Sequence, residues 1–245
     1  MRTFLLLCML ASSFAIAPTT QAATAARAAR PQNLLANPGF ERTLPGHDWM
    51  PADWDTSDAG LPTVFYGRDS LIVHGGSHAV TLANTSTVYP MGHNWSQTVL
   101  VGRETWGKDV VFSMWTRSNG LSGRAYLLVQ AYRDTLTKLA RIWGVDREDA
   151  RRRYGVTKID DPAMDLAWKR LQFEDPQTDW VKREVRIHVP RYTNVIFVRA
   201  GMFGTGQMLF DDASLTLEPA RPTPAAPQNV NLLTDPDFKD GALAW

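Results

Sequence analysis

Cysteine is almost absent from this sequence, since Cys8 is the only one in 245 residues. Because Cys8 lies in the apolar stretch at the N-terminus, the rest of the chain has no thiol for a disulfide or for a cysteine-based metal or redox site. We therefore expect a packed apolar core, with or without a bound metal ion, to stabilise the protein. The chain is long enough for one large domain or two small ones.

An excess of charge of either sign is also missing. Lys and Arg number 26 and Asp and Glu number 25, which gives a formal net charge of +1. This balance argues against nucleic acid or an anionic membrane as the main partner. After the N-terminal stretch, no apolar run approaches the roughly 20 residues of a membrane-spanning helix. We expect no nucleic-acid binding and no membrane insertion.

The one continuous apolar run lies at the start of the chain. Residues 1–3 include a basic Arg2, and residues 4–16 are apolar apart from two serines. A short basic start, an apolar stretch of about 7–15 residues and a small-residue exit predict a secretory signal peptide. We assign it to residues 1–22 and expect a secreted protein, either extracellular or periplasmic.

Residues 33–217 contain short apolar runs separated by turn sequences. Several runs alternate with period two and are rich in Val, Ile, Thr and aromatic residues, as strands are. Glycines at 120, 123, 204 and 206 suit hairpin turns. The pattern predicts an all-β fold, a two-sheet antiparallel jelly-roll sandwich. The expected strands cover residues 63–66, 79–82, 95–101, 110–117, 124–133, 181–189, 194–203 and 208–217.

One segment within this region has a helical pattern. Apolar residues recur at helical spacing over 136–143, and Asp146 is a residue type that caps the start of a second helix. We count residues 165–171 as a third helical turn. The sequence therefore predicts a small helical insertion over about residues 134–178.

The chain outside the predicted sandwich is organised differently. Residues 23–32 are an Ala-rich flexible stub, and residues 218–230 are a Pro/Ala linker of extended character. Residues 231–239, Asn-Leu-Leu-Thr-Asp-Pro-Asp-Phe-Lys, then repeat residues 33–41, Asn-Leu-Leu-Ala-Asn-Pro-Gly-Phe-Glu. A repeated domain start indicates tandem modules. We expect residues 231–245 to begin a second, truncated module, with a downstream domain in the intact protein; docking of this tail as a lone strand is the alternative.

The segment that opens the predicted sandwich, residues 33–41, resembles the start of family 4/9-type carbohydrate-binding modules. These modules are jelly rolls of the galactose-binding-like kind. The resemblance implies a protein that binds a polysaccharide or glycan on a concave sheet face, and only the helical insertion departs from it. Further matching segments follow in order at residues 51–54 (Pro-Ala-Asp-Trp), 74–82 (His-Gly-Gly-Ser-His-Ala-Val-Thr-Leu), 95–99 (Trp-Ser-Gln-Thr-Val), 110–115 (Val-Val-Phe-Ser-Met-Trp) and 210–215 (Phe-Asp-Asp-Ala-Ser-Leu).

The same resemblance implies a structural Ca²⁺ remote from the sugar site. Its ligands would be Glu41, the backbone near Ser77, and Asp211. Ca²⁺ takes about six to eight oxygens and mixes carboxylates with carbonyls, so the ion would tie the first strand, an early loop and the last strand together. The alternative is a set of surface carboxylates that hydrogen-bond to turns.

A sugar site requires aromatic and polar side chains on one exposed face. Aromatic rings cover the apolar face of a pyranose, while amides and guanidinium groups bind its hydroxyls, and the chain has 9 Trp and 10 Phe. In the alternative interpretation, the helical insertion covers this face and the aromatic residues form a second core. The candidate carbohydrate-binding residues are Trp54, Trp95, Gln97, Trp115, Arg117, Gln130 and Tyr132.

Motifs for catalysis are lacking. The five histidines do not have metalloprotease or triad spacing, and no nucleophile elbow or phosphate loop is present. A glycosidase needs two carboxylates about 5–10 Å apart, whereas Asp211 and Asp212 are expected to point to opposite faces of one strand. We expect a non-catalytic module of a multimodular carbohydrate-active or cell-surface protein. An adhesive sandwich that binds a protein is the alternative, and a glycoside hydrolase is a less expected one.

Overall fold

A computed structural model describes residues 32–57, 61–87, 92–156, 162–174 and 178–222, all of which belong to one unit, Pro31–Trp245. The predicted signal peptide over residues 1–22, nearly all of the stub and most of the linker lie outside the described residues. So does the predicted second-module start over residues 231–245.

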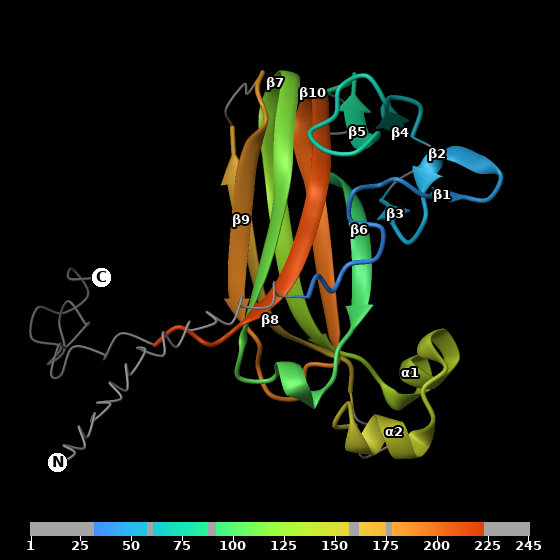
Figure 1. The fold of residues 1–245 in the computed structure, drawn as a ribbon, viewed down its shortest axis with the longest axis vertical. Coiled ribbons are helices and arrows are strands. Elements are labelled where there is room, and N and C mark those ends of the chain that lie inside the picture. Colours follow the sequence, from blue (N-terminus) through green and yellow to red (C-terminus); the bar gives the residue numbers. More distant parts are fainter. Residues whose placement is uncertain (1–31, 58–60, 88–91, 157–161, 175–177, 223–245) are drawn as a thin grey trace, which may run out of the picture. The chain divides into compact units, whose positions relative to one another are not determined.

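Two long strands organise the fold (Figure 1). Strands β7 (Asp109–Arg133) and β10 (Val195–Glu218) pair antiparallel along nearly their whole length. Both halves of this ribbon supply residues to one hydrophobic core, including Phe112 from the first half of β7 and Leu127 from the second. The ribbon therefore folds over, so that each half belongs to a different layer of a sandwich.

Glycines make this fold possible. Gly123 and Gly204 lie opposite each other at the bend, with φ of 129° and 98°. A Cβ at Gly123 would lie 2.2 Å from the carbonyl oxygen of Phe203, so only glycine fits. The hairpin turns predicted at these glycines are wrong. Because β7 and β10 bend at the same level, each strand continues through the bend, and their pairing resumes after a register shift between Thr205 and Gln207.

The remaining strands add to the two halves of the ribbon, and the all-β antiparallel sandwich is confirmed. A separate two-stranded pair consists of β1 (Thr43–Leu44) and β2 (His47–Pro51). One layer has the order β9 (Val181–His188), β7, β10, β5 (Ala79–Asn84) and β4 (Val64–Asp69). The other has the order β8 (Met164–Phe173), β7, β10, β6 (His93–Leu100) and β3 (Asp55–Thr56).

The opening segment of the domain, residues 33–36, forms hydrogen bonds to both layers. The Asn33 side chain accepts from Leu215 N and donates to the Ala213 carbonyl, each at 2.9 Å, and Leu34 N donates to the Leu215 carbonyl at 2.8 Å. In this way Asn33 extends the ladder along β10. Ala36 then hydrogen-bonds to a side chain of β6 in the other layer.

The helical insertion is smaller than the sequence predicts. Helices α1 (Leu136–Trp143) and α2 (Arg147–Arg152) begin at side-chain caps, Thr135 and Asp146, of which the Asp146 cap was predicted. They lie beyond the C-terminal end of β6 (Figure 1) and enclose a small core of their own. A short 3-10 helix, η1 (Arg103–Thr105), follows β6. The helical turn predicted for residues 165–171 is wrong, since they belong to β8. Pairing along β7 overrides the local preference there.

Candidate functional site

The layer that contains β8 presents one side to solvent, which we call the β8 face. Side chains alternate along a strand, so the buried Leu127 and Val129 of β7 direct Leu128 and Gln130 to the opposite side. The face consists of Tyr126, Leu128, Gln130 and Tyr132 from β7, Phe197, Arg199, Gly201 and Phe203 from β10, Trp168, Arg170 and Gln172 from β8, and Asn94, Ser96 and Thr98 from β6.

The strand register arranges these side chains in rows. Adjacent strands lie about 4.8 Å apart, so members of a row are direct neighbours. Three successive rows across β10, β7 and β8 are Phe197–Gln130–Trp168, Arg199–Leu128–Arg170 and Gly201–Tyr126–Gln172. Rows with aromatic rings therefore lie on both sides of a row with two arginines.

Aromatic rings are the main apolar component of the β8 face. Trp168 is 59% exposed. Tyr132 meets Phe197 edge to face with ring centroids 5.9 Å apart, and Tyr126 meets Phe203 at 5.1 Å. The face thus has one open indole and two fixed aromatic pairs, and within these pairs the Tyr126 ring is buried, at 4% exposed.

The arginines lie over these rings. The Arg170 guanidinium carbon is 5.4 Å from the Phe203 ring centroid and 6.0 Å from that of Tyr126. The Arg199 guanidinium carbon is 5.8 Å from the Phe197 ring centroid. Such cation–π contacts position a guanidinium while leaving N–H groups at its edge to donate.

Amide and carboxylate groups complete the polar component. Gln130 Nε2 donates to Asp165 Oδ1 at 2.6 Å. A concavity of about 400 Å³ lies at the bent end of the face, and its lining residues are Gly123, Arg124, Arg170, Gln172, Phe203 and Gly204. The combination of rings, amides and guanidinium groups suits a polar ligand with apolar C–H faces.

Two predicted sugar-binding tryptophans belong to the core. Trp54 is 4% exposed, packs on Phe40 at a centroid distance of 4.9 Å and donates to the Asn37 carbonyl. Trp95 is fully buried and donates to the Thr81 carbonyl at 3.2 Å. Neither ring can contact a glycan in this structure.

Gln97 is likewise buried and has a structural role. Its amide accepts from Ala36 N at 2.8 Å and donates to the Ala36 carbonyl at 2.9 Å. The β6 row of Trp95, Gln97 and Val99 mixes polar and apolar residues, so alternation alone did not identify its inner side. The structure shows that Trp95 and Gln97 face inward.

The predicted residues Trp115 and Arg117 lie in the other layer, on the first half of β7. Trp115 stacks on His74 with ring centroids 3.9 Å apart and planes inclined by 16°, and Trp180 meets His74 at 5.8 Å. One side of the Trp115 indole is therefore covered by the imidazole.

Only Gln130 and Tyr132 of the predicted set lie on the β8 face. Sequence reasoning missed Phe197 and Arg199, although the alternation of residues 195–203 carried the signal. It missed Trp168 because this residue was assigned to a helix. The described part of the helical insertion leaves Trp168 59% exposed, while Lys138 of α1 reaches the edge of the face, its Nζ 6.0 Å from the Tyr132 ring centroid.

A second polar cluster forms where Asp211 meets the loop of residues 74–78. Asp211 Oδ2 accepts from His74 N at 2.8 Å and Gly75 N at 3.0 Å, and Oδ1 accepts from Asp212 N at 2.7 Å. Burial raises the pKa of Asp211, and the three N–H donors only partly oppose this effect.

Glu41 holds the other end of the same loop. Its Oε1 accepts from Ser77 N at 2.8 Å and His78 N at 3.3 Å, and its Oε2 lies 3.1 Å from His78 Nδ1. Burial raises the pKa of Glu41, but the Ser77 and His78 donors outweigh it, so the net shift is downward. We call Glu41, Asp211 and the loop between their contacts the carboxylate clamp.

Asp212 does not follow the predicted opposite orientation to Asp211. β10 has a register shift at Asp211–Ser214, and Asp212 has φ of 46°. This irregularity lets Asp212 Oδ2 reach His74 Nδ1 at 2.6 Å while Asp211 holds the backbone of the same residue.

Carboxylate oxygens are the hard ligands that Ca²⁺ prefers. In the carboxylate clamp, however, Glu41 and Asp211 face N–H donors rather than carbonyls, and a cation would have to replace those donors. Among the described residues, no three His, Cys, Asp or Glu side chains are grouped to hold a metal ion. As arranged, the clamp does not fit Ca²⁺, which stays a prediction from the resemblance.

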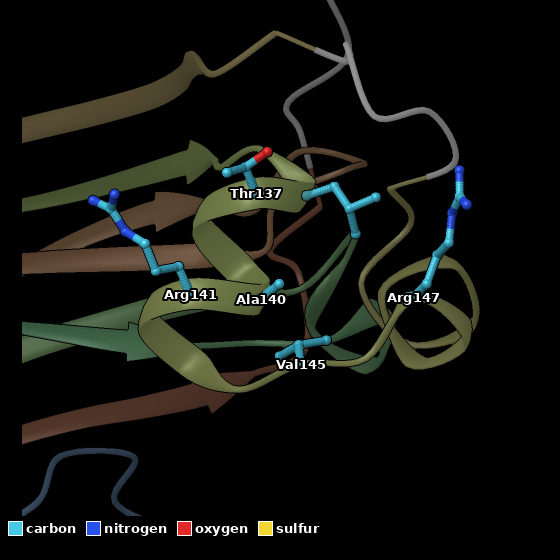
Figure 2. Close-up of a pocket in the computed structure, with 6 residues that line it drawn as sticks. Thr137, Ala140, Arg141, Val145 and Arg147 are labelled. Carbon is cyan, nitrogen blue, oxygen red and sulfur yellow. The ribbon is translucent and has the colours of Figure 1, made fainter.

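A further concavity, of about 530 Å³, lies against α1 and α2. Figure 2 shows Arg141 and Arg147 on opposite sides of the apolar Ala140 and Val145. This concavity lacks aromatic side chains, so it does not offer the stacking surface that a sugar ring requires.

No protein-family model and no curated protein sequence matches the chain. Within the described part of the chain, no helix is long and apolar enough to span a membrane.

Solved structures match the chain in fold. A Stig cyclase from Fischerella sp. TAU is 14% identical with a TM-score of 0.51, over 77% of this chain and 98% of the cyclase. A family 61 carbohydrate-binding module in complex with β-1,4-galactotriose is 19% identical with a TM-score of 0.45, over 76% and 99%. The enzymatically active domain of tailspike protein 4 from bacteriophage CBA120 is 11% identical with a TM-score of 0.49, over 76% and 21%.

These matches differ in what they support. The cyclase shows a shared fold alone. This chain spans about a fifth of the tailspike chain. Because one fold hosts many functions, the shared fold by itself assigns no function to this chain.

Proposed function

We propose that this protein is an exported, non-catalytic carbohydrate-binding module that holds a polysaccharide or glycan on the β8 face. It would act as one module of a multimodular carbohydrate-active or cell-surface protein. The observation that carries this proposal is the ordered alternation of aromatic and polar rows on one solvent-facing sheet.

The chemistry of the β8 face suits a sugar. The exposed Trp168 indole matches the apolar C–H face of a pyranose, which it can cover by stacking. Gln130 and Gln172 supply amide donors and acceptors for hydroxyls on either side of the arginine row. Interleaved polar rows interrupt the apolar surface, which makes the face less suited to a large apolar protein interface.

Affinity electrophoresis tests the proposal. The protein is run through gels that contain xylan, β-glucan or polygalacturonate, and its sedimentation with cellulose is measured. We expect retardation or sedimentation with at least one polymer and its loss in Trp168→Ala. Trp49→Ala is the matched control, because Trp49 is also exposed, at 43%, but lies on β2 outside the β8 face. Free migration with every polymer, or equal loss in both variants, contradicts the proposal.

A further inference from the structure

We infer that the β8 face selects an acidic glycan, one that carries carboxylate groups as a polyuronate does. This inference rests on the proposed function and names the substrate class of the same site. Two arginines form one row at the middle of the face.

Arg199 and Arg170 occupy one cross-strand row, on either side of Leu128. Their backbones are separated by two strand spacings, or about 10 Å. Both lie over aromatic rings rather than against acids. Within the described parts of the chain, neither guanidinium has a carboxylate partner.

The acids of this layer lie at its margins and have other contacts. Asp165 accepts from Gln130. Glu174 forms an ion pair with Arg124 at 2.9 Å. Asp55 lies on the edge strand β3, at the end of the arginine row and two strands from Arg199, and it accepts from the backbone of Thr56. The centre of the face therefore has two positive groups that no described acid neutralises.

An acidic sugar would complete this arrangement. A carboxylate can accept two parallel hydrogen bonds from a guanidinium, and these charge-assisted bonds are about twice as strong as neutral ones. A neutral sugar supplies only hydroxyls to the same groups. Since the chain has a formal net charge of only +1, selection would come from this row rather than from a general attraction of anions.

The experiment compares four polymers in affinity gels: polygalacturonate, neutral galactan, neutral β-glucan and polyglutamate, an anionic polymer without sugar. We expect the tightest binding to polygalacturonate. Arg199→Gln and Arg170→Gln should each weaken it about tenfold, the loss expected for a hydrogen bond to a charged group. Arg141→Gln is the control, because Arg141 is exposed on α1 and outside the face.

Each of the other possible outcomes contradicts a specific part of the inference. Binding to neutral glycans with none to polygalacturonate overturns the selectivity and leaves the proposed function intact. Equal binding to polyglutamate overturns glycan selectivity in favour of a general anion site. Wild-type affinity of both Gln variants for polygalacturonate overturns the role of the arginine row. Absence of binding to any glycan overturns the inference and the proposed function together.

Discussion

The Trp115 indole stacks on the His74 imidazole, with ring centroids 3.9 Å apart. His74 is in turn held by Asp212 through its ring and by Asp211 through its backbone. An aromatic residue with the attributes of a sugar platform therefore serves to fix the loop of residues 74–78 on the layer opposite the β8 face.

Because Trp115 lies on this layer, we expect its substitution to lower the stability of the protein but not its affinity for a glycan. Trp115→Ala should lower the free energy of unfolding by about 2–3 kcal/mol, because it removes a half-buried ring, and leave glycan affinity unchanged. Urea denaturation and affinity electrophoresis measure the two effects. A loss of affinity in the folded variant would assign the site to this layer instead.

The bend in the β7–β10 ribbon predicts a sharp difference between two glycines. Gly123→Ala should destabilise the domain by several kcal/mol, because its Cβ would lie 2.2 Å from a backbone oxygen. Gly120→Ala is the matched control, since it has φ of 62° but no atom within 4 Å of a Cβ. It should cost only the strain of the left-handed backbone, about 1 kcal/mol. Thermal unfolding compares the two, and equal losses would contradict the steric explanation.

Asp109 predicts a dependence of stability on pH. Burial raises its pKa, but hydrogen bonds from Arg221 N, His188 and Arg186 outweigh that effect and hold it below the ordinary 3.8. A depressed folded-state pKa stabilises the protein above the unfolded-state pKa, and this contribution disappears as the pH falls through the folded-state value. The stability difference between wild type and Asp109→Asn should therefore be largest near neutrality and shrink below about pH 4. A difference that stays constant into acid contradicts the assignment.

Because the carboxylates of the clamp already accept from N–H donors, we expect the stability of the protein not to depend on a metal ion. Asp211→Asn should cost about 1–3 kcal/mol, because an amide cannot accept all three N–H groups that the carboxylate accepts. Melting temperature should be the same in EDTA and in millimolar Ca²⁺. A rise with Ca²⁺ that disappears in Asp211→Asn would instead support the ion implied by the family resemblance, with a rearranged loop.

Alternation of side chains made most of the fold predictable. Runs such as residues 79–82 and 181–189 match β5 and β9, because alternate positions in each run differ clearly in polarity. The bends at Gly123 and Gly204 were not predictable as bends. A glycine with positive φ closes a hairpin or bends a paired strand equally well, and only the partner strand decides between them.

The site was less predictable than the fold. Trp54 and Trp95 have the same residue type as Trp168, and sequence alone does not reveal that two of the three point inward. The assignment of residues 165–171 to a helix removed Trp168 and Arg170 from consideration. The β8 face combines rows from four strands, and a row becomes visible only when the register between strands is known.

The pairing of Asn33 with Leu215 has a consequence for synthesis. The two residues lie 182 positions apart in the sequence, yet Leu215 N donates a hydrogen bond to the Asn33 side chain. During translation, Asn33 and Leu34 must wait for the last strand before their hydrogen bonds to Ala213 and Leu215 can form. Such non-local pairing slows folding. A nascent chain that ends before β10 should therefore remain open to proteolysis, and protection should arrive in one late step.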